Sequence, residues 1–154
     1  MNQNKYELTF KIESSLENLK QKIDELCSPY VSSKGVKFPS PFILSENNEL
    51  TGNYKIFHQK GLTQVVIDLR LNQLSETQIE VKIQSYSQSI INGQPTPMYI
   101  IQNYTDEFLK SFNLSLQGKT KEEIFSHMKG CLGVSLVIIT LGFSLLSLVL
   151  YSIV

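Results

Sequence analysis

Residues 62–86 read LTQVVIDLRLNQLSETQIEVKIQSY and contain two runs in which apolar and polar side chains alternate. Alternation with a period of two is typical of a strand that buries one face and exposes the other. The apolar residues are Val65, Ile67, Leu69 and Leu71 in the first run and Ile79, Val81 and Ile83 in the second. The LSET segment between the runs suits a hairpin. We therefore expect two antiparallel strands in a sheet with one wet face and one covered face.

Two further strands and a helix are expected before this hairpin. Tyr6–Ile12 alternates strictly, and Asn53–Gln59 does so well enough to place His58 on an apolar strand face as a structural histidine. Between these strands, Ser14 and Glu17 have the spacing of a capping box that starts a helix. The apolar face of that helix consists of Leu16, Leu19, Ile23, Leu26 and Cys27.

A second helix is expected over Pro97–Gln117, where aromatic and aliphatic residues recur at helical spacing. This helix is the natural cover for the sheet. Two interpretations of its apolar face remain open: plain core packing, or an aromatic-lined cavity for a ligand. The candidate lining residues from the helix and the hairpin are Ile101, Tyr104, Phe108, Phe112, Val65, Ile67, Ile79 and Val81.

The order strand, helix, loop, antiparallel strands and long helix resembles the START-like (SRPBCC, helix-grip) superfamily. The resemblance covers residues 5–117 and rests on element order and patterning. It implies an α+β fold in which an antiparallel sheet wraps the long helix and leaves a cavity for lipids, sterols or other hydrophobic molecules. It implies no catalytic residue and no cofactor.

Residues 131–154, CLGVSLVIITLGFSLLSLVLYSIV, carry no charged side chain. As a helix they would span about 36 Å, against a hydrocarbon core of about 30 Å. We therefore expect one C-terminal transmembrane helix, a single-pass tail anchor with the lipid bilayer as partner. Lys119, Lys121 and Lys129 precede it, which predicts a cytoplasmic N-terminal domain at a membrane.

The same segment carries small and hydroxyl residues on one helical face, either merely tolerated there or used for self-association. They include Gly133, Thr140, Ser144 and Ser147. Before the segment, Thr120 and Glu123 form a second capping box. The expected organisation is a soluble domain over 1–117, a short juxtamembrane helix over 118–130 and the anchor over 131–154.

Composition excludes several functions. The 14 basic and 14 acidic residues balance and show no basic cluster, which argues against nucleic-acid binding. His58 and His127 share no ligand spacing, and no catalytic motif occurs, so neither a metal site nor an enzyme is expected. The sequence predicts a membrane-tethered cytoplasmic binding module that holds a hydrophobic or lipid ligand. The alternative is a non-catalytic interaction domain with a solid core that recruits a partner protein to the membrane.

Overall fold

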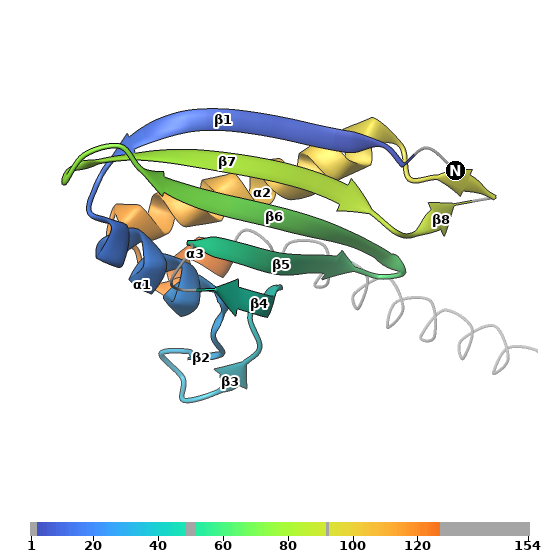
Figure 1. The fold of residues 1–154 in the computed structure, drawn as a ribbon. Coiled ribbons are helices and arrows are strands. Elements are labelled where there is room, and N and C mark those ends of the chain that lie inside the picture. Colours follow the sequence, from blue (N-terminus) through green and yellow to red (C-terminus); the bar gives the residue numbers. More distant parts are fainter. Residues whose placement is uncertain (1–2, 49–51, 92, 127–154) are drawn as a thin grey trace, which may run out of the picture.

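The computed structural model describes residues 3–48, 52–91 and 93–126, and its centre is a five-stranded antiparallel sheet. The strand order is β1-β7-β6-β5-β4, with β1 and β4 at the two edges (Figure 1). The bounds are β1 Lys5–Glu13, β4 Phe42–Asn48, β5 Asn53–Lys60, β6 Thr63–Gln73 and β7 Gln78–Ser87. The expected hairpin joins β6 to β7, where Leu74 N–H donates to the carbonyl of Gln78 at 2.9 Å.

The two edges of the sheet differ in regularity. β1 pairs with β7 without interruption over all nine of its residues, with Thr9 opposite Lys82 at its centre. On the opposite edge, the pairing of β4 with β5 shifts register between Leu44 and Glu46. Such a bulge bends an edge strand and makes it a poor template for another strand.

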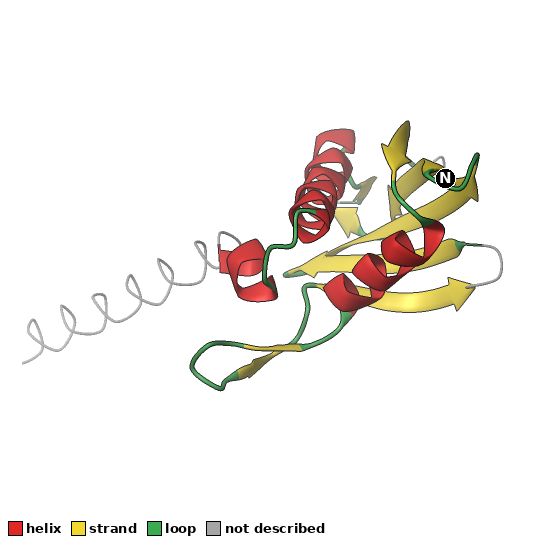
Figure 2. Cartoon of the chain, turned by 90° about the vertical axis from the view of Figure 1, so that its left-hand side faces the viewer, coloured by secondary structure: helices red, strands yellow, loops and turns green. Residues whose placement is uncertain are grey.

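Both long helices, α1 (Leu16–Cys27) and α2 (Met98–Leu116), lie on one face of the sheet (Figure 2). The capping residue of α1 is Ser15 and not Ser14, because Ser15 Oγ accepts from Asn18 N–H at 3.2 Å. Ser14 still belongs to the sheet, since its N–H donates to the Thr77 carbonyl at 2.9 Å. The apolar side chains of both helices join those of the inner sheet face in one core.

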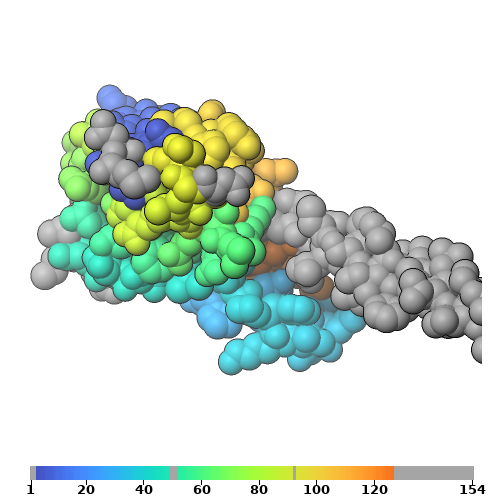
Figure 3. All heavy atoms as spheres, turned by 90° about the vertical axis from the view of Figure 1, so that its right-hand side faces the viewer, coloured from blue at the N-terminus to red at the C-terminus, as the bar shows by residue number. Residues whose placement is uncertain are grey.

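Several short elements lie around the central sheet and the two long helices. The hairpin of β2 (Tyr30–Val31) and β3 (Lys37–Phe38) projects from it (Figure 3), and β8 (Ile90–Ile91) pairs with β9 (Gln94–Pro95). The predicted second capping box is confirmed at the start of α3 (Lys121–Ser126). There Glu123 Oε2 accepts from Thr120 N–H at 2.8 Å and Thr120 Oγ1 accepts from Glu123 N–H at 3.3 Å.

α3 is attached to the main body. The Phe125 ring lies 5.4 Å from the ring of Tyr30 and 6.0 Å from that of Phe42, and the side chain of Ile124 is buried. The Glu122 carboxylate accepts from Ser33 N–H on the projecting hairpin at 2.7 Å. The division of the chain after residue 117 stays a prediction, but α3 shares the core of the preceding residues.

The membrane part of the predicted fold class is wrong for the described chain. Within residues 3–48, 52–91 and 93–126, no helix combines the length and the apolar character needed to cross a bilayer. The 19-residue α2 is amphipathic because it packs one face on the sheet, and Asp106 and Lys110 lie exposed on the other. The tail anchor, the bilayer partner and the membrane localisation are corrected with it. Residues 131–154, including Gly133, Thr140, Ser144 and Ser147, lie outside the described residues.

Candidate functional site

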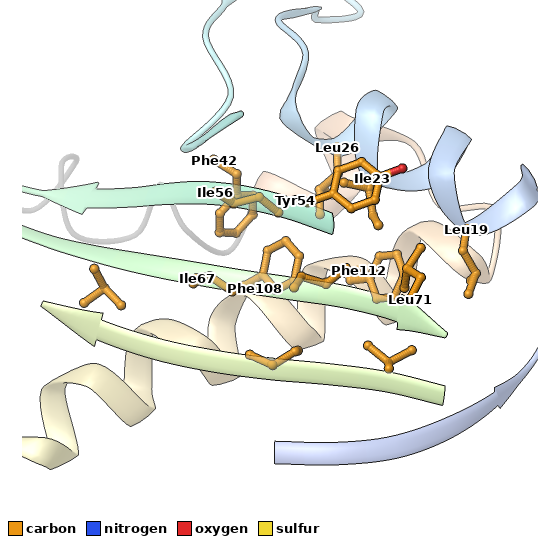
Figure 4. Close-up of a cluster of buried hydrophobic side chains, with 14 of the residues drawn as sticks. Leu19, Ile23, Leu26, Phe42, Tyr54, Ile56, Ile67, Leu71, Phe108 and Phe112 are labelled. Atoms are coloured by element: carbon orange, nitrogen blue, oxygen red, sulfur yellow. The ribbon is translucent and has the colours of Figure 1, made fainter. Parts of the chain in front are cut away.

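The predicted lining residues all lie where the sheet meets α2. Seven of them are buried in the core: Ile101, Phe108, Phe112, Val65, Ile67, Ile79 and Val81. The eighth, Tyr104, is half-buried at the border of the core. The rings of Phe108 and Phe112 stack with a centroid distance of 6.0 Å and an interplanar angle of 5° (Figure 4). Whether these side chains line a ligand space stays a prediction.

Phe42 on β4 is a central member of this core that the sequence did not single out. Its ring meets the edge of Phe108 at 5.3 Å and that of the His58 imidazole at 4.7 Å, and it is completely buried. The α1 residues Leu19, Ile23 and Leu26 close the same space from the other side (Figure 4). Phe42 therefore links the β4 edge, the long helix and the one described histidine.

His58 forms the most polar part of the interior. Its side chain is completely buried on β5, and its Nδ1 lies 3.2 Å from the Tyr104 carbonyl of α2. A carbonyl can only accept, so Nδ1 carries the proton in the neutral ring and Nε2 is left as an acceptor. Nε2 lies 3.5 Å from Oε2 of Glu107, and neither atom has a hydrogen-bond partner among the described residues.

The other oxygen of Glu107 turns outward. Glu107 Oε1 forms an ion pair with Lys60, whose ammonium group lies 5.7 Å from the centre of the Tyr104 ring. Removal from water lowers the pKa of His58 to about 4, although the Tyr104 carbonyl and Glu107 both favour the charged ring. Because His58 has no exposed surface, it cannot meet a substrate, and we assign the cluster a structural role.

The outer face of the sheet carries an unexpected apolar row. Tyr86 pairs with Val66, Val66 with Phe57, and Phe57 with Ile43, so the four residues cross β7, β6, β5 and β4 in one line. Val65 and Ile67 point into the core, which places Val66 on the opposite face, yet Val66 is only 1% exposed. The row ends at the edge strand with Ile43, which is 51% exposed.

Charged residues flank this row on the same face. The next line across the sheet runs from Glu7 through Gln84, Asp68 and Lys55 to Glu46, and the line after it pairs Arg70 with Lys82. Two shallow hollows of about 210 and 320 Å³ lie here, and Asp68 and Arg70 border both. Lys55 is paired with Glu46 at 2.9 Å and Lys82 with Glu80 at 3.0 Å.

Arg70 differs from these lysines. Among the residues that the structure describes, no carboxylate forms an ion pair with it. It is exposed at the centre of the sheet, and it is the one arginine of the sequence. The alternating pattern alone predicted an ordinary solvent-exposed face here, because the apolar row from Tyr86 to Ile43 follows only from the strand register.

Comparison with known proteins gives a likeness of fold alone. No family model and no curated protein matches the chain. A START superfamily protein from Mycobacterium smegmatis is similar over 76% of this chain and 96% of that chain, with 8% identity and a TM-score of 0.47. The Zhui aromatase/cyclase from Streptomyces sp. R1128 is similar over 84% of this chain and 98% of that chain, with 5% identity and a TM-score of 0.40. The element order that the sequence predicted for residues 5–117 is present in the structure, and likeness at this level does not extend to ligand or reaction.

Proposed function

We propose that this chain is a non-catalytic protein-interaction domain with a solid core, which binds a partner polypeptide on the outer face of its sheet. The observation that carries the proposal is the apolar row from Tyr86 to Ile43. The solvent-exposed face of a sheet normally carries polar side chains. The buried Val66 and the exposed Ile43 in one line therefore need another explanation.

The partner chemistry follows from the groups beside the row. Ile43 and Phe57 offer apolar contact at the β4 edge, and Arg70 offers a guanidinium that can bind a carboxylate through two parallel hydrogen bonds. We therefore expect a polypeptide surface that presents an apolar side chain and, beyond the line of Asp68 and Lys55, an Asp or Glu. The hollow of about 320 Å³ beside Arg70 gives the acidic side chain room.

Packing supports the solid core. Phe42, Phe108 and Phe112 are each at most 2% exposed, and Phe108 contacts Phe42 edge-on and stacks on Phe112. Aromatic rings at these distances gain stability from one another beyond the area they bury. A domain built in this way acts through its surface.

The test places a photo-crosslinking residue at position 43 of the full chain in cells. We expect a discrete protein adduct that is lost when Arg70→Glu is added and kept with Arg70→Lys. The matched control carries the crosslinker at Leu74, an apolar residue that is 48% exposed and directly follows the end of β6. The proposal would be contradicted if no adduct formed at position 43, or if the adduct formed equally with Arg70→Glu and Arg70→Lys.

A hydrophobic small molecule is the second candidate, favoured by a row of half-buried apolar residues on the inner face of β1. These are Tyr6, Leu8, Phe10 and Ile12, which pack only partly against the core. An apolar molecule between β1 and α2 would complete their burial. Mass spectrometry of the purified full chain tests this candidate, and a stoichiometric apolar compound would replace the interaction domain with a carrier.

A further inference from the structure

β1 is an open edge of the sheet. It ends the strand order, and within the described ranges no strand lies on its other side. It is regular over Lys5–Glu13 and contains no proline, whereas the opposite edge is interrupted by the Leu44/Glu46 register shift. Long regular edge strands tend to pair with another strand. β1 is such a strand, because it lacks the bulge that interrupts β4.

The backbone of β1 presents its free hydrogen-bonding groups at every second residue. Ser14 N–H donates toward β7, to the Thr77 carbonyl. Because successive residues of a strand point their N–H and C=O groups to opposite sides, the even-numbered residues of β1 bond to β7. The outward groups therefore belong to Lys5, Glu7, Thr9, Lys11 and Glu13.

The sequence of β1, KYELTFKIE, is complementary to itself about its centre. We propose that β1 pairs antiparallel with β1 of a second copy of this chain, with Thr9 opposite Thr9 on a twofold axis. In this register Lys5 meets Glu13 and Glu7 meets Lys11 on the outer face, and each contact occurs twice. On the inner face Tyr6 meets Ile12 and Leu8 meets Phe10.

Opposite charges in both charged pairs, Lys5 with Glu13 and Glu7 with Lys11, favour a second copy of this chain over other strands. Directly opposed side chains of opposite charge stabilise an antiparallel pair, and like charges destabilise it. A shift by two residues would set Lys11 opposite Lys5 and Thr9 opposite Glu7, so the charges also fix the register. A strand from an unrelated protein would need to match the same order of charges.

The flank of α2 nearest to β1 supports the same contact. Glu107 marks the side of α2 that faces β5, because it contacts His58 and Lys60 of that strand. Leu109 is two residues further along, about 200° around the helix axis, and so lies on the opposite side, toward β1. Leu116 lies two turns beyond Leu109 on that side, and both are half-buried. A twofold axis beside β1 brings the two copies of this flank toward each other beneath the joined sheets.

Cysteine cross-linking of the full chain tests the register. The Cα atoms of a hydrogen-bonded antiparallel pair lie about 5.5 Å apart, within the range that a disulfide spans. We expect Thr9→Cys to form a disulfide-linked dimer under mild oxidation, above the background of the unsubstituted chain with Cys27 and Cys131. Lys5→Cys and Glu13→Cys should each fail alone and cross-link when mixed. Absence of the Thr9→Cys dimer in a folded chain, or linking at Lys5→Cys alone, would overturn the proposal.

Charge reversal tests the contact without an oxidant. Glu7→Lys alone and Lys11→Glu alone set like charges opposite each other twice, and each should raise the dimer dissociation constant about tenfold or more. The double variant Glu7→Lys/Lys11→Glu restores both contacts and should dimerise like the parent chain. Analytical ultracentrifugation measures this, with urea unfolding to show that all variants fold.

Other results of these experiments would exclude the pairing of β1 with β1. A monomer at all concentrations, or association that is equal in all four chains, would overturn the pairing and point to no contact or to another surface. If the chain stayed monomeric and β1 paired with a strand of another protein, that protein and not a second copy would be the occupant of this edge. None of these outcomes affects the cross-link from Ile43, which lies on the opposite edge strand, so the proposed function fails or stands separately.

Discussion

Nε2 of His58 faces Oε2 of Glu107 across 3.5 Å, and both atoms are buried without a hydrogen-bond partner among the described residues. With the ring proton on Nδ1, two lone pairs point at each other in a region from which water is excluded. The arrangement links β5 to α2 and makes part of the stability of the fold sensitive to protonation.

The first prediction concerns pH. Burial lowers the pKa of His58 from 6.5 to about 4. Between pH 6.5 and pH 4 the imidazole is therefore protonated in the unfolded chain and neutral in the folded chain. Stability is fully present above pH 6.5 and should fall by about 3 kcal/mol as the pH drops to about 4, at about 1.4 kcal/mol per pKa unit. Urea unfolding of the full chain and of His58→Gln across this range measures the difference. Parallel profiles for the two chains would contradict the assignment, since all other ionisable groups are the same in both chains.

Glu107→Gln should relieve the opposed lone pairs. The new amide N–H can donate to Nε2, which satisfies a buried acceptor, while the lost ion pair with Lys60 lies near the surface and contributes little. At pH 7.5 we expect the free energy of unfolding to stay unchanged or rise by about 1 kcal/mol. Glu107→Ala, which leaves Nε2 without a donor, is the control and should not stabilise. A clear loss in the Gln variant would mean that the carboxylate itself holds the site together.

Phe108→Ala measures how full the core is. Phe108 is completely buried between Phe42 and Phe112, so its removal should cost about 3–5 kcal/mol if the surrounding rings form a solid core. Leu114→Ala on the same helix, where the side chain is only half-buried, should cost clearly less. Urea unfolding of the full-length variants decides. A small loss together with a changed co-purifying apolar compound would favour the ligand cavity.

Gly52 and Gly61 allow a matched comparison of backbone strain. Both have positive φ, 63° and 58°, but a Cβ at Gly52 would lie 2.8 Å from the Leu71 carbonyl oxygen, whereas a Cβ at Gly61 meets open space. Gly61→Ala should therefore cost about 1 kcal/mol from φ alone. Gly52→Ala should cost at least about 2 kcal/mol more, because it also disturbs the hydrogen bond from Leu71 N–H to the Gly52 carbonyl. Equal losses would mean that the two strands separate easily at this point.

Local patterns predicted the elements that bury a regular face. The alternation around Val65 and Ile79 and the helical spacing of Phe108 and Phe112 hold in the structure, because each depends only on the period of its own element. The start of α1 was misplaced by one residue. The reason is nonlocal, since Ser14 bonds to Thr77 at the end of the neighbouring strand.

The candidate surface depended on information that no single segment contains. Val66 breaks the alternation of β6, and only the register with Tyr86 and Phe57 shows that its neighbours cover it. Phe42 stands in a short apolar stretch with no clear period, and its place beside Phe108 arises when β4 meets α2. The membrane prediction used the length and the missing charges of residues 131–154 and the lysines that precede them. None of these features depends on how distant segments pack together.

The joining of β1 to β7 has a consequence for the order of folding. Glu7 and Gln84, which share a hydrogen bond in the finished sheet, are 77 residues apart in the chain. During synthesis β1 leaves the ribosome long before its neighbour exists, and contacts so distant in sequence form slowly. For that interval both edges of KYELTFKIE are open, and two nascent chains on one messenger RNA would present the same self-complementary segment to each other.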